Sequence, residues 1–205
     1  LISKLKEVDV ADDYTKKEGY LSPALFIIVS GGEKREKDYF SFFKNKNYSF
    51  PRIIIEFISK DKGGIGGFDV DKLVEEGLRI KNEKAKSKGA DIVDTINLIT
   101  DVDHFYTQLK RNIPKCTEND LNLFISNPCF EIWLYYTYYA EMPDFKIPEN
   151  KLKISSMFKT YLGDKHKHKG GVDPRKAPLK IENAIINSAN NYLENEKLKQ
   201  KYKKK

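Results

Sequence analysis

The sequence has little of what marks membrane proteins, secreted proteins and zinc-thiolate proteins. Of its 205 residues only 2 are cysteines, and Cys116 and Cys129 have neither CxxC spacing nor a cysteine-histidine cluster around them, which favours reduced thiols over a disulfide or a zinc site. No apolar run approaches the roughly 20 residues of a membrane span. The opening LISKLKEVDV has no apolar run or cleavage site of a signal peptide. We therefore expect a cytoplasmic protein that does not contact a membrane.

Signatures of nucleotide binding and of repeat architectures are also missing. The glycine-rich GGIGG (63–67) is not followed by the Lys-Ser/Thr of a phosphate-binding loop, so it is typical of a flexible crossover. No internal repeat is visible. With no ATP-binding motif in the chain, any nucleotide-driven switch has to come from another chain.

The charge is unevenly distributed along the chain. The formal net charge is +7, and residues 151–205 hold 15 Lys/Arg against 5 Asp/Glu, a net of +10, which leaves 7 − 10 = −3 for the rest. A basic C-terminal part suits contact with a polyanion, because lysines that neutralise phosphates release counterions. The competing interpretation of KLKQKYKKK (197–205) is a solvated lysine tail.

Two hydrophobic periodicities alternate along most of the chain. Short apolar or β-branched runs predict strands at 24–30, 51–59, 92–100 and 121–126. Amphipathic stretches and capping signals predict helices at 33–46, 69–89, 104–113 and 127–140. Asp69 is the expected cap of the second helix, and Asn127 that of the fourth, with Pro128 in its first position. This alternation is typical of an α/β fold with a mostly parallel four-stranded sheet covered by helices on both faces.

Composition divides the chain into three parts. Residues 1–22 are polar and predict a loose N-terminal segment, and residues 23–143 hold the α/β domain. Residues 144–205 predict a Lys-, Gly- and Pro-rich basic loop followed by a helical C-terminal appendage over 178–200.

Acidic residues gather where the predicted strands end. INLITDVDHF (96–105) places Asp101 and Asp103 directly after an apolar run. Sites in α/β sheets form outside the carboxyl ends of the strands, and two neighbouring carboxylates are best stabilised by a cation such as Mg²⁺. The alternative is that Asp103 caps a helix starting at His104.

Three glutamates are predicted to lie at the same edge of the sheet. Glu33 and Glu36 follow the glycine turn after the first strand, and Glu131 follows the Asn127-Pro128 turn. Carboxylates placed so can help to hold a divalent metal that activates water for phosphoryl transfer. Each of the three could instead complement the dipole of a helix in its first turn.

The basic C-terminal part contains the candidate nucleic-acid-binding residues, which are Lys165, His166, Lys167, His168, Lys169 and Arg175. The two histidines suit a solvated or phosphate-facing role better than a metal site, because no third ligand accompanies them. The run WLYYTYY (133–139) favours helix packing or a partner surface over base stacking, since basic residues do not interleave with it.

Three stretches resemble the RloB family, which is associated with bacterial restriction and abortive-infection loci. They are IIVSGGEKREKDYF (27–40), DVDHF (101–105) and above all ISNPCFEIWLYY (125–136). The resemblance covers about residues 24–140, with a weaker echo at 178–200. It implies a Toprim-like, and so Rossmann-like, fold in which a glutamate after the first strand acts as acid or base and an aspartate pair after the third holds Mg²⁺. Carried over to this chain, it implies catalytic roles for Glu33, Asp101 and Asp103, which would bind Mg²⁺ or Mn²⁺.

The resemblance also has implications for partners and contains one departure. It implies that the substrate is a nucleic acid, either DNA or RNA, and that an ATPase from the same defence locus is a partner. It leaves open whether the chain forms a homo-oligomer. The family pattern after the first strand resembles E-G-E-x-T-E, whereas this chain reads GGEKRE (31–36). Gly31 therefore stands where the leading glutamate is expected. Either Glu33 substitutes for it or the first catalytic carboxylate has been lost. By the matching of positions, Glu33 and Glu36 carry over only as secondary motif residues.

Three functions remain open on these grounds. The first is a Mg²⁺-dependent nucleic-acid phosphoesterase of an antiviral defence system, and the second is a non-catalytic module that binds nucleic acid or an ATPase. The third, a nucleotide-sugar transferase using DxD with Mn²⁺, lacks any recognisable sugar-nucleotide site. Phosphatases of the haloacid dehalogenase type are excluded, because their nucleophilic DxD lies on the first strand.

Overall fold

The structure, a computed structural model, describes residues 24–32, 34–44, 53–58, 68–87, 95–102, 105–146, 148–167 and 171–191. Its strands are β1 (Ala24–Ser30), β2 (Ile53–Ile58), β3 (Thr95–Asp101) and β4 (Asn122–Ser126). Its α-helices are α2 (Arg35–Ser41), α3 (Val70–Ser87), α4 (Tyr106–Glu118), α5 (Glu131–Tyr136), α6 (Ile154–His166) and a C-terminal helix at 181–191. Short 3-10 turns are η2 (Phe42–Lys44), η4 (Lys151–Lys153) and η5 (Ala177–Lys180).

The strands form one four-stranded sheet in the order β2-β1-β3-β4, and every neighbouring pair is parallel. The chain leaves β1 toward β2 on one side and returns to β3 on the other side of β1. The direction of winding thus reverses between β1 and β3. In sheets of this kind, the crevice outside the carboxyl ends of the two strands at the reversal is where ligands bind.

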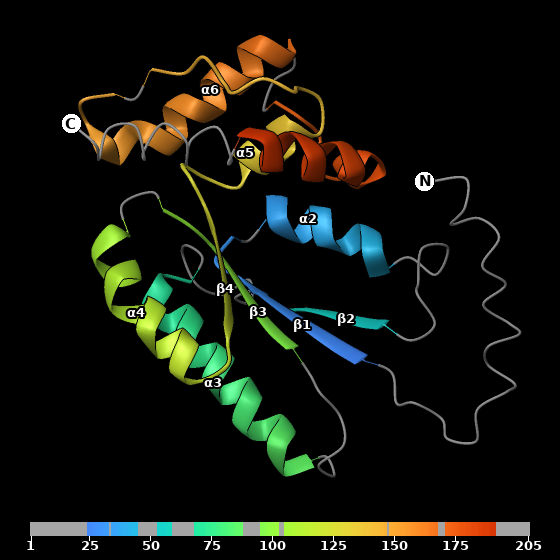
Figure 1. Ribbon diagram of the computed structural model, residues 1–205, viewed down its shortest axis with the longest axis vertical. Helices are drawn as coiled ribbons and strands as arrows, with labels where there is room; N and C mark the ends of the chain where they lie inside the picture. Colours follow the sequence, from blue (N-terminus) through green and yellow to red (C-terminus); the bar gives the residue numbers. More distant parts are fainter. Residues whose placement is uncertain are drawn as a thin grey trace, which may run out of the picture.

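Helices α3 and α4 cover one face of the sheet, and α2 lies against the other (Figure 1). Burial alternates along β3, so that Ile96 and Leu98 point into the core under α3 and α4, whereas Asn97, Ile99 and Asp101 point to the α2 side. Within the described residues this second face is only partly covered. The expected helical cover on both faces is therefore incomplete there.

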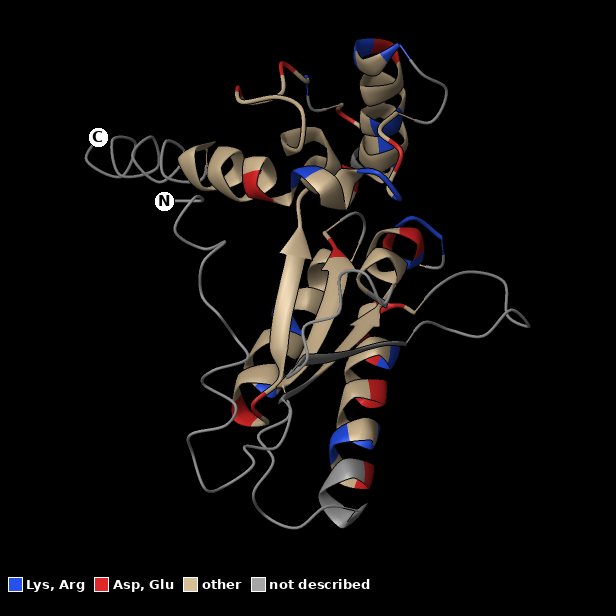
Figure 2. Cartoon of the chain, turned by 90° about the vertical axis from the view of Figure 1, so that its right-hand side faces the viewer, with Lys and Arg blue, Asp and Glu red and all other residues tan. Residues whose placement is uncertain are grey.

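A second hydrophobic core lies beyond the carboxyl ends of the strands. Helices α5, α6 and 181–191 form a cap there, toward which the strand arrowheads point (Figure 2). Buried side chains of the cap include Leu134, Tyr135, Phe158, Leu162 and Ala184, and Tyr39 of α2 joins them. The WLYYTYY run therefore supplies core packing, as its interpretation favoured.

The four strands lie where the sequence predicts them, and Asp69 caps α3, because its Oδ1 accepts a hydrogen bond of 2.9 Å from the Lys72 N–H. Both cysteines are buried free thiols. None of the described helices has the length and apolar character that crossing a membrane requires. The loose segment 1–22 and the glycine-rich crossover 63–67 are predictions that lie outside the described residues.

Several helix predictions are wrong in their bounds. Helix α4 continues through Pro114 to Glu118 instead of ending at residue 113, because the buried Cys116 beyond the proline packs into the core. Helix α5 begins at Glu131, not Asn127, because residues 127–130 form the bend and turn that follow β4, and it ends at Tyr136.

The segment 144–176, which was expected to be a basic loop, contains helix α6, which the sequence pattern did not predict. The basic and glycine-rich composition hides the spacing of Ser155, Phe158 and Leu162, which form the buried side of α6. Of the helix expected at 178–200, the structure describes η5 and residues 181–191. Residues 192–205, including the lysine-rich end, lie outside the described part.

Candidate active site

The ends of β1, β3 and β4 meet at one edge of the sheet. The Gly31 N–H donates a 2.9 Å hydrogen bond to the Ile99 carbonyl, Asp101 is in register with Ser126, and the Val102 N–H donates to the Ser126 carbonyl at 2.8 Å. The predicted meeting of these strand ends is confirmed. Glu33 and Asp103 lie outside the described residues, so their roles stay predictions.

Asp101 ends β3 on the face that α2 covers. Its Oδ1 is buried and has no hydrogen-bond partner among the described residues, while the Phe130 backbone N–H bonds the carboxyl group. Burial, and to a smaller extent the nearby Glu36 and Glu131 carboxylates, raise the pKa of Asp101 to about 8 against the opposing effect of Lys159. A buried acceptor without a donor suits a proton or a cation.

Glu36 lies in the first turn of α2 and is buried with its carboxylate against Gly32. Burial raises the pKa of Glu36, and the charge of Glu131 adds to the effect. Because Gly32 has no side chain, the Glu36 carboxylate can lie beside the end of β1. Glu36 thus sits with Asp101 at the reversal point of the sheet, rather than serving only as a solvent-exposed partner of the helix dipole.

Glu131 is the first residue of α5 and is 2% exposed. Its Oε1 lies 3.1 Å from Arg35 Nε and 3.6 Å from Lys159 Nζ. The Arg35 Nη2 also donates a 2.7 Å hydrogen bond to the Val172 carbonyl. Glu131 therefore joins α2, α5 and α6 through two cations, which neither the helix-dipole nor the metal interpretation predicted.

The helix that Asp103 was expected to cap begins later than the sequence predicts. Helix α4 starts at Tyr106 and not at His104, and its N-cap residue is Phe105. Asp103 lies outside the described residues, so its metal-binding role and its contacts at the start of α4 stay predictions.

The donors present suit a hard divalent cation in chemistry, although they do not by themselves make a complete ligand set. Asp101 and Glu36 offer carboxylate oxygens, the ligands that Mg²⁺ prefers. No group of three or more His, Cys, Asp or Glu side chains in the part of the chain that the structure describes is arranged to hold a metal. Water molecules, and Asp103 and Glu33 as the sequence predicts, would supply further oxygens.

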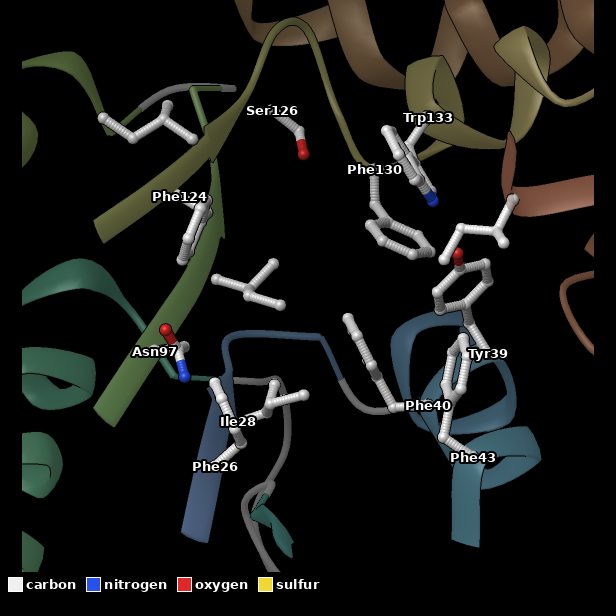
Figure 3. Close-up of a pocket in the computed structure, with 13 residues that line it drawn as sticks. Phe26, Ile28, Tyr39, Phe40, Phe43, Asn97, Phe124, Ser126, Phe130 and Trp133 are labelled. Carbon is white, nitrogen blue, oxygen red and sulfur yellow. The ribbon is translucent and has the colours of Figure 1, made fainter. Parts of the chain in front are cut away.

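An apolar pocket of about 660 Å³ lies between the sheet and the side chains of α2 and α5 (Figure 3). Phe26, Ile28 and Phe124 line it from the sheet, and Phe40 and Trp133 line it from the helices. Asn97 also borders it, but its amide is engaged within the sheet, donating to the Ile27 carbonyl at 3.3 Å and accepting from Asn122 Nδ2 at 3.1 Å.

The predicted nucleic-acid-binding residues lie on the cap, and most already have contacts. Lys165 Nζ lies 5.0 Å from the centre of the Tyr139 ring, and the His166 ring packs against Tyr138. Lys167 is the C-cap of α6, with a φ of 51°. Arg175 pairs with Asp173 at 3.0 Å. His168 and Lys169 lie outside the described residues.

Sequence reasoning assigned no function to Arg35 or Lys159, although both contact Glu131. Arg35 stands inside the GGEKRE stretch, where its charge gives no sign of a partner on α5. Lys159 lies in a segment predicted as loop, 28 positions from Glu131. Only the packing of α6 on α5 brings this lysine to the carboxylates.

A protein-family model described as RloB-like protein matches residues 26–205. No curated protein matches the chain. No solved structure matches it either.

Proposed function

This chain belongs to the RloB-like family, and we propose that it is a Mg²⁺-dependent nucleic-acid phosphoesterase of a bacterial antiviral defence system, with a Toprim-type active site and an ATPase partner. The observation that carries the proposal is the buried Oδ1 of Asp101, which lacks a partner among the described residues at the reversal point of the sheet. That is the place and the chemistry that a metal-dependent phosphoesterase requires.

The contacts of each residue indicate its role in the proposed reaction. Asp101 and Glu36 would hold the cation, together with Asp103 and Glu33, and the Phe130 N–H keeps the Asp101 carboxyl oriented. When bound, the cation would polarise a substrate phosphate and lower the pKa of a water molecule. Glu131 is engaged with Arg35 and Lys159 and so fixes the cap over the site.

A second candidate function rests on Gly31. This position corresponds to the leading glutamate of the family pattern, and a glycine there offers no acid or base. A non-catalytic module that binds nucleic acid or an ATPase would keep the metal-binding carboxylates and lose turnover. The two functions differ in cleavage and agree in metal binding.

Cleavage assays on four forms of the chain test the proposal. The chain as it stands, Gly31→Glu, Gly31→Ala and Asp101→Asn are each incubated with single-stranded DNA, duplex DNA, tRNA and other RNA, in MgCl₂, in MnCl₂ and in EDTA. Gly31→Ala is the matched control, because a Cβ at this position lies 3.1 Å from the Phe68 carbonyl and both substitutions need the same small shift.

We expect metal-dependent cleavage by the chain or by Gly31→Glu, and none by Asp101→Asn. Cleavage by Gly31→Glu alone would favour the module that has lost its acid or base. Absence of cleavage in every form, with Asp101→Asn folded, would reject the phosphoesterase.

A further inference from the structure

We propose that Lys159 is a phosphate-binding residue of this site. Its ammonium group would move from Glu131 to the phosphate backbone of an incoming nucleic acid. The inference deepens the proposed function and rests on it. Lys159 is carried by α6, outside the three stretches that resemble the family, and the sequence gives it no role.

The first argument is the balance of charge around Glu131. Oε1 of this single carboxylate faces both Arg35 Nε and Lys159 Nζ, at 3.1 and 3.6 Å. A divalent cation bound by Asp101 and Glu36 would engage those two carboxylates, so that Glu131 alone would be left to balance Arg35 and Lys159. With the nearer Arg35 paired to Glu131, the positive charge of Lys159 would then be available for an anion at the same place.

The second argument is the difference in freedom between the two cations. Arg35 has a side chain 26% exposed and is anchored a second time by its 2.7 Å bond to the Val172 carbonyl. The Lys159 side chain is 49% exposed and makes the longer contact. A lysine ammonium on a flexible stem can exchange one anion for another at small cost. Lys159 is therefore the cation that can move.

The third argument is position. The Asp101 and Glu36 carboxylates interact electrostatically with Lys159, so its ammonium group lies within range of the carboxylates that would hold the metal. A phosphate that bridges a divalent cation at Asp101 and an ammonium on the cap would have its charge met from two sides. Lys159 would thus position the phosphate between sheet and cap.

Binding of a fluorescently labelled oligothymidylate in MgCl₂, over a series of KCl concentrations, tests this role. We expect Lys159→Gln to weaken binding about tenfold and to reduce the salt slope by about 0.7, the value for one phosphate contact to a single strand. Lys159→Arg should restore most of the affinity and the slope. Lys153→Gln, which removes the same charge from an exposed residue just before α6, should change affinity by less than about twofold.

Glu131→Gln gives a result of opposite sign. Because it frees Lys159 from its carboxylate, it should strengthen binding in the otherwise unchanged chain and have no such effect together with Lys159→Gln. Equal small losses for Lys159→Gln and Lys153→Gln, or no binding by any form, would overturn the proposal. A Lys159→Gln chain that keeps its Mg²⁺-dependent rise in Tm, while losing affinity and slope, would support it.

The outcomes for Lys159 and for the phosphoesterase can be separated. A smaller salt slope of binding in Lys159→Gln, combined with no cleavage by any form, would support the phosphate contact of Lys159 and contradict the phosphoesterase activity. Cleavage that depends on Asp101 with no effect of Lys159→Gln would do the reverse.

Discussion

A Cβ atom on Gly32 would overlap Oε2 of Glu36, so the Glu36 carboxylate occupies the space that any other residue at position 32 would need. The glycine turn after β1 therefore has a specific consequence for the site. It lets a buried carboxylate from α2 lie beside the strand end.

We expect Gly32→Ala to displace the Glu36 carboxylate and to reduce the stabilisation by Mg²⁺. Thermal denaturation in EDTA and in MgCl₂ measures both effects. The control is the same substitution in a Glu36→Ala background, where the clash is gone and the alanine should be nearly neutral. If the effects of Gly32→Ala and Glu36→Ala on the Tm are additive, the Glu36 carboxylate does not lie against Gly32.

Mg²⁺ or Mn²⁺ should raise the Tm of the chain, because the cation binds the folded state only. At a concentration of about 100 Kd the gain is about 2.7 kcal/mol, and each kcal/mol raises the Tm of a chain of this size by about 2–4 °C. Asp101→Asn should largely abolish the rise, since it removes a charge and a strong oxygen ligand. Glu131→Gln should reduce it less. An unchanged response in Asp101→Asn would remove the metal from this site.

The metal-free chain should lose stability as the pH rises toward 8. The pKa of Asp101 is raised to about 8 in the folded chain, whereas an unfolded aspartate titrates near 3.9. Between these values the folded chain holds a proton that the unfolded chain has released, so each step up in pH favours unfolding. Urea denaturation in EDTA over this range should show a falling free energy of unfolding. Asp101→Asn should remove that part of the pH dependence. If the free energy of unfolding fell equally with pH in both chains, the raised pKa would not belong to Asp101.

Asn191 should contribute to stability by tying the C-terminal helix to the segment that follows α5. Its Nδ2 donates to the Ala140 carbonyl at 2.8 Å, and its side chain is buried. Asn191→Ala leaves that carbonyl without its donor, and we expect a loss of about 1–3 kcal/mol in the free energy of unfolding. The exposed neighbour in Asn190→Ala is the control and should cost less than about 0.5 kcal/mol. Equal losses would indicate a helix-propensity effect instead.

The sequence by itself determined the sheet and the location of its edge. The continuous apolar run of β1 and the β-branched and apolar residues of β3 favour inner strands, and the strand ends are marked by Gly31 and Asp101, which break these patterns. Parallel strands then bring those ends to one side. These are local consequences of side-chain chemistry, so they could be read without coordinates.

Only the tertiary structure decided how the cap meets this edge. Asn127 and Pro128 carry the signal of a helix start, yet α5 begins at Glu131, because the path of the chain over the sheet outweighs a local preference. The contact of Glu131 with Lys159 depends on packing between α5 and α6, and no periodicity in either segment encodes it. Ion pairs between distant elements have no local signature, since charge acts through space and leaves no spacing in the chain.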